Sequence, residues 1–198
     1  MSRSARLLIG AVILGVIVAA WVWSRSGASR TVMDLVDQFP SSRRGQNPDQ
    51  YEVIDATING DTRRAIFFKN AGRVGFELTV PEDAWLELSV GMLDKANTIP
   101  GDGVGFWIYV VPLGPDGQPA VEPDGRTRSE ELLSLAVNPF GNPGDRSWHD
   151  LTLDLSSHAG KRVEVRFVTR HSPPGAKAEG EAGAGDFFVI GRPRIVVN

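Results

Sequence analysis

The sequence contains no cysteine among its 198 residues. This absence excludes a disulfide framework, a thiolate metal site and a cysteine nucleophile, and it removes several enzyme classes with them. It does not assign a compartment, because an oxidising environment permits disulfides without requiring them. The stability of the chain therefore depends on packing alone.

An excess of charge of one sign is also missing. The chain has 21 basic and 24 acidic residues and a net charge of −3. No basic field favours nucleic acid, which we do not expect as a partner.

Recognisable catalytic motifs are absent as well. His149, His158 and His171 are the three histidines, and their spacing fits no zinc motif. The chain has no Gly-x-Ser-x-Gly elbow. Glu130 and Glu131 are adjacent, so their side chains point in different directions and form no acid/base pair. We therefore predict no enzymatic activity.

Aspartates are frequent beside Gly, Pro and Asn, where their carboxylates either form turns or bind Ca²⁺. No EF-hand spacing is present, which favours the turn role. We predict no cofactor and assign no metal ligands, with one structural Ca²⁺ as the open alternative.

The longest uncharged apolar run extends from Leu7 to Trp23. As a helix it would cover about 25 Å, at the short end of what crosses a bilayer. Arg6 and Arg25 flank the run, and Trp21 is placed as in an aromatic belt. The pattern predicts a transmembrane anchor, represented by Leu7, Ile13, Ile17, Trp21 and Trp23.

A cleaved signal peptide is the alternative to an anchor, with a weak cleavage site at residues 27–29. The length of the run and its tryptophans favour an uncleaved anchor. The short leader predicts a cytoplasmic N-terminus, a single pass through the inner (cytoplasmic) membrane and a periplasmic or otherwise extracytoplasmic C-terminal domain.

The remaining sequence divides into two parts. Val32, Leu35, Val36 and Phe39 recur at helical spacing, which predicts a short amphipathic helix followed by a linker. We therefore expect a tail and anchor in 1–30, a helix and linker in 31–50, and an exported domain in 51–198.

From residue 51 onward the apolar period changes to two. The pattern predicts about eight or nine short strands separated by Gly, Pro, Asn and Asp turns, as in an all-β antiparallel sandwich. The clearest alternations lie in 74–80, 85–92, 151–155 and 163–168, and the most apolar strand in 104–111. Residues 112–128 and 172–185 are predicted loops.

Tryptophans in this domain are candidates for stacking on sugars. Trp107 lies in the most apolar strand and is predicted to be core, whereas Trp148 follows a loop and is the best exposed candidate. Packing in the core or at its rim is the favoured alternative even for Trp148. The candidate ligand-binding residues are Trp148, Trp85 and Arg170. The alternation of Arg162, Glu164 and Arg166 predicts one solvent-facing side of a strand.

Four segments carry a resemblance to a known family: 72–92, 101–110, 146–175 and 185–196. Together they resemble the galactose-binding-like jelly-roll modules of bacterial membrane-associated proteins. The resemblance implies a jelly-roll fold with ligands at loops of one end. An aromatic residue usual near the closing Gly-x-Pro-x-Ile is replaced here, since Val189 and Ile190 precede Gly191.

Two functions follow as hypotheses. The first is a non-enzymatic, membrane-anchored accessory or scaffold subunit that docks on a larger respiratory, photosynthetic or transport complex, with the lipid bilayer and other membrane or exported proteins as partners. The alternative is a cell-surface carbohydrate- or polymer-binding module with glycans as partners.

Overall fold

The structure is a computed structural model that describes residues 29–45, 47–171 and 187–197. Contacts divide the chain into residues 1–30 with Asn198 and a compact unit from Thr31 to Val197, which is described here. The predicted anchor at Leu7–Trp23 and the whole predicted loop 172–185 lie outside the described residues. Within the described ranges, no helix is long and apolar enough to cross a membrane.

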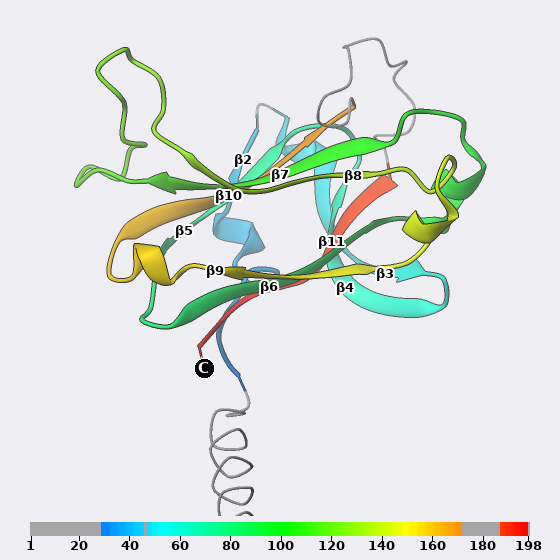
Figure 1. Cartoon of the computed structure of the whole chain (residues 1–198), viewed down its shortest axis with the longest axis horizontal. Coiled ribbons are helices and arrows are strands. Elements are labelled where there is room, and N and C mark those ends of the chain that lie inside the picture. Colours follow the sequence, from blue (N-terminus) through cyan, green and yellow to red (C-terminus); the bar gives the residue numbers. More distant parts are fainter. Residues whose placement is uncertain (1–28, 46, 172–186, 198) are drawn as a thin grey trace, which may run out of the picture. The chain divides into compact units, whose positions relative to one another are not determined.

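Two antiparallel sheets form a β-sandwich (Figure 1). Sheet A has the order β3 (Tyr51–Ile58), β4 (Asp61–Phe68), β11 (Phe188–Val197), β6 (Ala84–Met92) and β9 (His149–Asp154), and β1 (Arg30–Asp34) also pairs with β11. Sheet B has the order β2 (Arg43–Arg44), β5 (Arg73–Thr79), β10 (Arg162–Arg170), β7 (Val104–Pro112) and β8 (Glu130–Val137). Short 3₁₀ helices lie at Phe39–Ser41, Pro48–Gln50, Asp94–Thr98, Pro143–Asp145 and Ser156–His158.

The core lies between the sheets and follows the strand alternation. Phe68 and Phe188 of sheet A and Phe106 and Phe167 of sheet B are fully buried. Their rings contact one another across the sandwich, with 5.0 Å between the centroids of Phe106 and Phe188. Inward residues at every second position supply the rest, because side chains alternate between the faces of a strand. The predicted all-β sandwich is confirmed.

The predicted amphipathic helix in 31–39 is wrong. Arg30–Asp34 forms β1 on β11, and the chain then turns into the 3₁₀ helix at Phe39. The Asp34 carboxylate accepts a hydrogen bond from the Val36 amide at 2.8 Å, and the Leu35 amide donates to the carbonyl of Pro193 at 2.9 Å. Tertiary pairing with β11 thus outweighs the local helical spacing. The linker also contains β2, and the described strands number eleven rather than eight or nine.

The solvent-facing side predicted for Arg162, Glu164 and Arg166 needs one correction. Glu164 is 3% exposed. It lies on the outer face of sheet B, where Gly75 leaves room for its carboxylate and Arg166 and Arg43 lie over it. A neighbouring arginine pair, which sequence alternation does not reveal, accounts for the burial.

Candidate binding groove on sheet A

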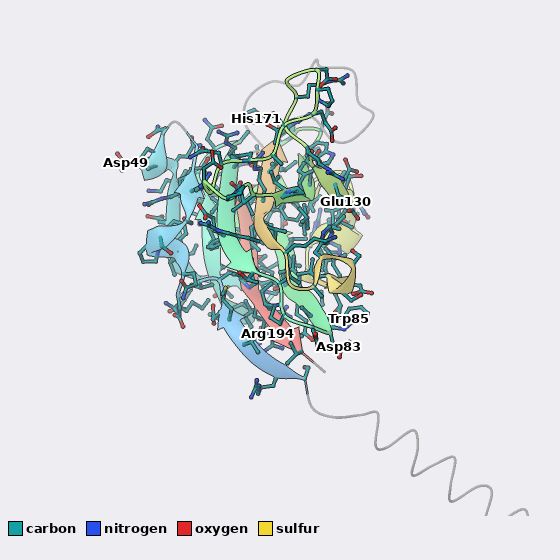
Figure 2. The ribbon with its side chains drawn as sticks, turned by 90° about the vertical axis from the view of Figure 1, so that its left-hand side faces the viewer. Asp49, Asp83, Trp85, Glu130, His171 and Arg194 are labelled. Atoms are coloured by element: carbon teal, nitrogen blue, oxygen red, sulfur yellow. The ribbon has the colours of Figure 1, made fainter. Side chains whose placement is uncertain are left out.

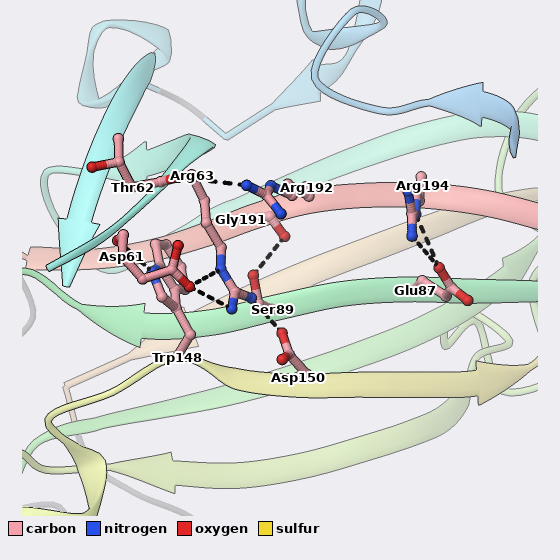
Figure 3. A network of polar contacts seen from close by, with 10 residues as sticks. All are labelled: Asp61, Thr62, Arg63, Glu87, Ser89, Trp148, Asp150, Gly191, Arg192 and Arg194. Atoms are coloured by element: carbon pink, nitrogen blue, oxygen red, sulfur yellow. Dashed lines mark hydrogen bonds and ion pairs between the residues drawn. The ribbon is translucent and has the colours of Figure 1, made fainter. Parts of the chain in front are cut away.

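A polar groove of about 270 Å³ crosses the outer face of sheet A, the face turned away from sheet B. Its residues come from β4, β6, β9 and β11, and Figure 3 shows most of the polar ones. The polar residues that line this groove, called the sheet A groove below, are Arg63, Glu87, Ser89, Asp150, Thr152, Arg192 and Arg194.

Strand alternation brings these side chains to one face. Leu86, Leu88 and Val90 of β6 belong to the core, so Glu87 and Ser89 between them point outward. Ser89 pairs with Gly191 on one side and with Asp150 on the other, and Glu87 pairs with Arg194 and Thr152. These two neighbouring sets of cross-strand pairs, centred on Ser89 and Glu87, therefore form the floor of the groove.

A β-bulge in β11 shapes the middle of the groove. Gly191 pairs with Ser89 and Arg194 pairs with Glu87, so β11 has one more residue than β6 between these pairs. Arg192 in the bulge has φ of +47°, a left-handed conformation that costs a non-glycine residue about 1–3 kcal/mol. Its Nη2 lies 3.5 Å from the Thr62 carbonyl oxygen, a long hydrogen bond.

Arg63 is the centre of an ion-pair network at one end of the groove. Its guanidinium donates to Asp61 at 2.7 Å and also to Asp150. Burial lowers the pKa of Arg63, but the hydrogen bonds and charges of Asp150 and Asp61 outweigh this, so the pKa is raised above its ordinary value. At the other end, Arg194 donates to Glu87 at 2.7 Å. Both groove carboxylates, Glu87 and Asp150, are therefore paired.

Trp148 packs on the sheet beside this network. Its indole N–H donates to the Asp61 carbonyl oxygen at 3.0 Å, and the Arg63 guanidinium lies 5.1 Å from the ring centroid. A Cβ atom built on Gly191 would lie 2.9 Å from Cζ3 of the indole, so only glycine allows this close approach. Trp148 also covers a second apolar cluster on this face, made of Ala56, Ile58, Ala65 and Val189.

No protein-family model matches this chain. It is 28% identical over 138 residues to an uncharacterized protein of Archaeoglobus fulgidus, in a match covering 69% of this chain and 30% of that protein. The match thus spans less than a third of that relative's length.

Solved structures similar to the chain include carbohydrate-binding modules. CBM51 from Clostridium perfringens GH95, in complex with methyl-galactose, has a TM-score of 0.45 at 16% identity and covers 82% of this chain and 98% of its own. TmCBM61 in complex with β-1,4-galactotriose has a TM-score of 0.43 at 14% identity, covering 81% and 90%. The CBM22 tandem of Paenibacillus barcinonensis Xyn10C has 0.47 at 11% identity, covering 86% and 46%.

Two of the three candidate ligand-binding residues border the sheet A groove. Trp148 lies at the Ser89 end. Trp85, on the same face of β6 and two residues before Glu87, lies at the other end, where Figure 2 also labels Arg194. Along β6, Gly91 under Trp148 is about 20 Å from Trp85, at roughly 3.4 Å per residue. Both indoles are half-buried.

Arg170 does not join this group. It ends β10 in sheet B, and its guanidinium lies 4.9 Å from the ring centroid of Trp107. Trp107 is 8% exposed, which confirms its prediction as core.

The arginines of the groove were not found by sequence reasoning. Arg192 and Arg194 flank Pro193 inside a strand, and a proline within a strand pattern marks a bulge or an edge. That signal was available in the sequence. The contribution of Arg63 depends on the pairing of β4 with β11 and carries no local signal.

The groove offers hydrogen-bond donors and acceptors side by side. It presents guanidinium donors, carboxylate acceptors and the Thr152 hydroxyl, with both carboxylates held by arginines. In the described parts of the chain, no group of three or more His, Cys, Asp or Glu residues could hold a metal ion.

Proposed function

We propose that the protein is a non-catalytic binding module and that the sheet A groove holds a polyhydroxylated ligand, a carbohydrate. Vicinal hydroxyl groups both donate and accept, and they match the alternating guanidinium and carboxylate groups of Arg63–Asp150 and Arg194–Glu87. Because these groups pair with each other, the groove is already fixed in position before a ligand arrives. A groove ordered in this way loses little entropy on binding.

The observation that carries this proposal is the conformation of Arg192. Ion pairs among the described residues engage Arg63 and Arg194 but not Arg192. The bulge nevertheless keeps Arg192 at φ of +47°, although glycine would fit without strain. Strained residues concentrate at ligand sites, where the surrounding structure maintains them. A guanidinium held only by a long hydrogen bond to the Thr62 carbonyl oxygen is suited to donating two hydrogen bonds to a sugar.

The test is the substitution Arg192→Gly in the full chain. We expect R192G to lose at least about tenfold in affinity, because hydrogen bonds from a charged donor contribute about 1.5–3 kcal/mol. Its free energy of unfolding should stay equal or rise, since glycine relieves the left-handed backbone. A panel of neutral polysaccharides in affinity gel electrophoresis identifies the ligand, and calorimetry gives the affinities.

Asn59→Gly is the matched control. Asn59 has φ of +48° in the turn between β3 and β4, outside the groove. N59G should show a smaller relief of strain, because Asn tolerates the left-handed region better than Arg, and its affinity for the polysaccharide should be unchanged. Full retention of affinity by R192G, or failure of every polysaccharide to bind, would contradict the proposal.

Membrane attachment is the second part of the proposal. It is supported by the uncharged apolar run at residues 7–23 and its flanking arginines. The module would then be held at the inner membrane with its groove facing the extracytoplasmic side. The scaffold hypothesis requires an exposed apolar patch. The large apolar side chains exposed in the described ranges are Val32, Val121 and Phe140, on three separate segments.

A further inference from the structure

A second pocket, of about 310 Å³, lies on the outer face of sheet B, opposite the sheet A groove across the sandwich. It is lined by Arg43 and Arg44 of β2, Arg73 of β5, and Glu164 and Arg166 of β10. Residues of the loop 113–129 between β7 and β8 complete it. Four arginines thus face one glutamate, although the whole chain has a net charge of −3.

The buried Glu164 carboxylate holds Arg166 at the floor, and Arg43, which lies near Glu164, is held by a direct ion pair with Glu77. Arg166 Nε donates to Glu164 Oε1 at 2.6 Å, and Arg43 Nη1 lies 3.8 Å from Oε2. Gly75 makes the arrangement possible, because a Cβ atom at this position would lie 2.3 Å from Glu164 Oε1. A carboxylate buried in this way compensates part of the positive charge and holds the Arg166 guanidinium in one geometry.

The loop 113–129 provides a hydrogen-bonded wall. The Gly117 carbonyl oxygen accepts from Arg43 Nη2 at 2.7 Å, which ties the loop to β2. Isolated bridges at Leu113–Pro119 and Val121–Thr127 close the loop on itself. Gln118 and Thr127 add neutral polar groups to the lining. The wall is therefore built from paired backbone.

Arg44 and Arg73 remain without a carboxylate. Ion pairs in this region of the described structure use Arg43, Arg162 and Arg166 together with Glu77 and Glu164. Arg44 is exposed and its guanidinium lies 5.2 Å from the centroid of the Phe39 ring. Arg73 is exposed at the rim. Two positive charges thus stand beside two guanidinium groups that are already fixed.

We propose that this pocket binds a tetrahedral oxyanion, a sulfate or phosphate group. The planar guanidinium fork matches two oxygens of such a group, and several arginines around one anion relieve their mutual repulsion. A carbohydrate hydroxyl cannot neutralise this charge. The proposal is independent of the sheet A groove, since it depends on other residues and on the opposite face.

The experiment is calorimetric titration of the full chain, in mild detergent, with sodium sulfate and with sodium phosphate. Sodium chloride at equal ionic strength measures screening alone. We expect both oxyanions to bind and R44Q/R73Q to lose at least about tenfold in affinity. Titrations at pH 6 and pH 8 distinguish the two anions, because inorganic phosphate changes from mainly singly to mainly doubly charged between these pH values, whereas sulfate keeps its charge.

R126Q/R128Q is the matched control. This variant also removes two positive charges, from exposed ion pairs on the loop 113–129. Neither arginine lines the pocket. Its affinity for sulfate and for phosphate should equal that of the wild type. Three outcomes overturn the proposal: equal affinities of R44Q/R73Q and wild type, an equal loss in R126Q/R128Q, and no heat beyond that of chloride. Arg44 and Arg73 are both exposed, so R44Q/R73Q should keep the unfolding midpoint of the wild type.

Discussion

At the scale of single residues, glycine decides how closely Trp148 approaches sheet A. A Cβ atom at Gly191 would lie 2.6 Å from Ser89 Oγ and 2.9 Å from Trp148 Cζ3. We expect Gly191→Ala to lower the free energy of unfolding by about 1–3 kcal/mol, because the indole or the strand must shift. Urea unfolding followed by tryptophan fluorescence measures this. Thr152→Ala, at an exposed position on the same face, should stay within about 0.5 kcal/mol of wild type; a similar loss in both variants would count against the close-packing argument.

The sequence predicts the environment of a residue correctly where that environment is formed by residues nearby in the chain. The burial of Trp107 and the turn role of Asp116 and Asp124 follow from local pattern, and both aspartates accept amide hydrogen bonds two residues on. Inference failed where the partner comes from a distant strand. Glu164 is buried because Gly75 and Arg43 arrive from β5 and β2, and no spacing within β10 encodes that.

At the scale of elements, the segment 31–39 shows that tertiary pairing can outweigh the periodicity of the local sequence. A helix would bury Val32 and Leu35 on one stripe, whereas the strand and turn leave Val32 38% exposed and Leu35 fully buried. We therefore expect Leu35→Ala to cost about 2–5 kcal/mol of unfolding free energy. Val32→Ala should cost less than about 0.5 kcal/mol. Denaturation midpoints of the two variants decide between the structures, and equal losses would favour the helix.

The other elements show why most of the sandwich was predictable. Strands buried on one face impose a period of two on the sequence, and that period is visible in β5, β6, β9 and β10. Strands β1 and β2 are stabilised by single neighbours and carry few apolar residues, so their pattern is weak. Pro193 is a local signal for a bulge in β11, but the residues that the bulge places over the groove depend on the register with β6, which is a property of two strands.

At the scale of the whole molecule, two polar sites lie on opposite outer faces of one continuous core. The core contains buried residues from both sheets, so the faces are held rigidly relative to each other. The two sites share no lining residue. A ligand in the sheet A groove and an oxyanion on sheet B would therefore bind together, and the module would join two chemically different partners.

Where such a module acts depends on the apolar run that precedes it. We expect the full chain to stay with membranes after alkaline carbonate washing. Ile13→Arg/Ile17→Arg should release it, because each charge near the centre of a spanning helix costs about 2.5–3.5 kcal/mol of insertion free energy. Ile13→Leu/Ile17→Leu keeps the run apolar and should behave as wild type. Mass spectrometry of the membrane-bound chain reads its N-terminus, and a chain beginning after residue 27 would show a cleaved signal peptide instead. Release of the wild type by carbonate would remove the anchor from the proposal while leaving both binding sites open to test, since every residue that forms them lies between Arg43 and Arg194.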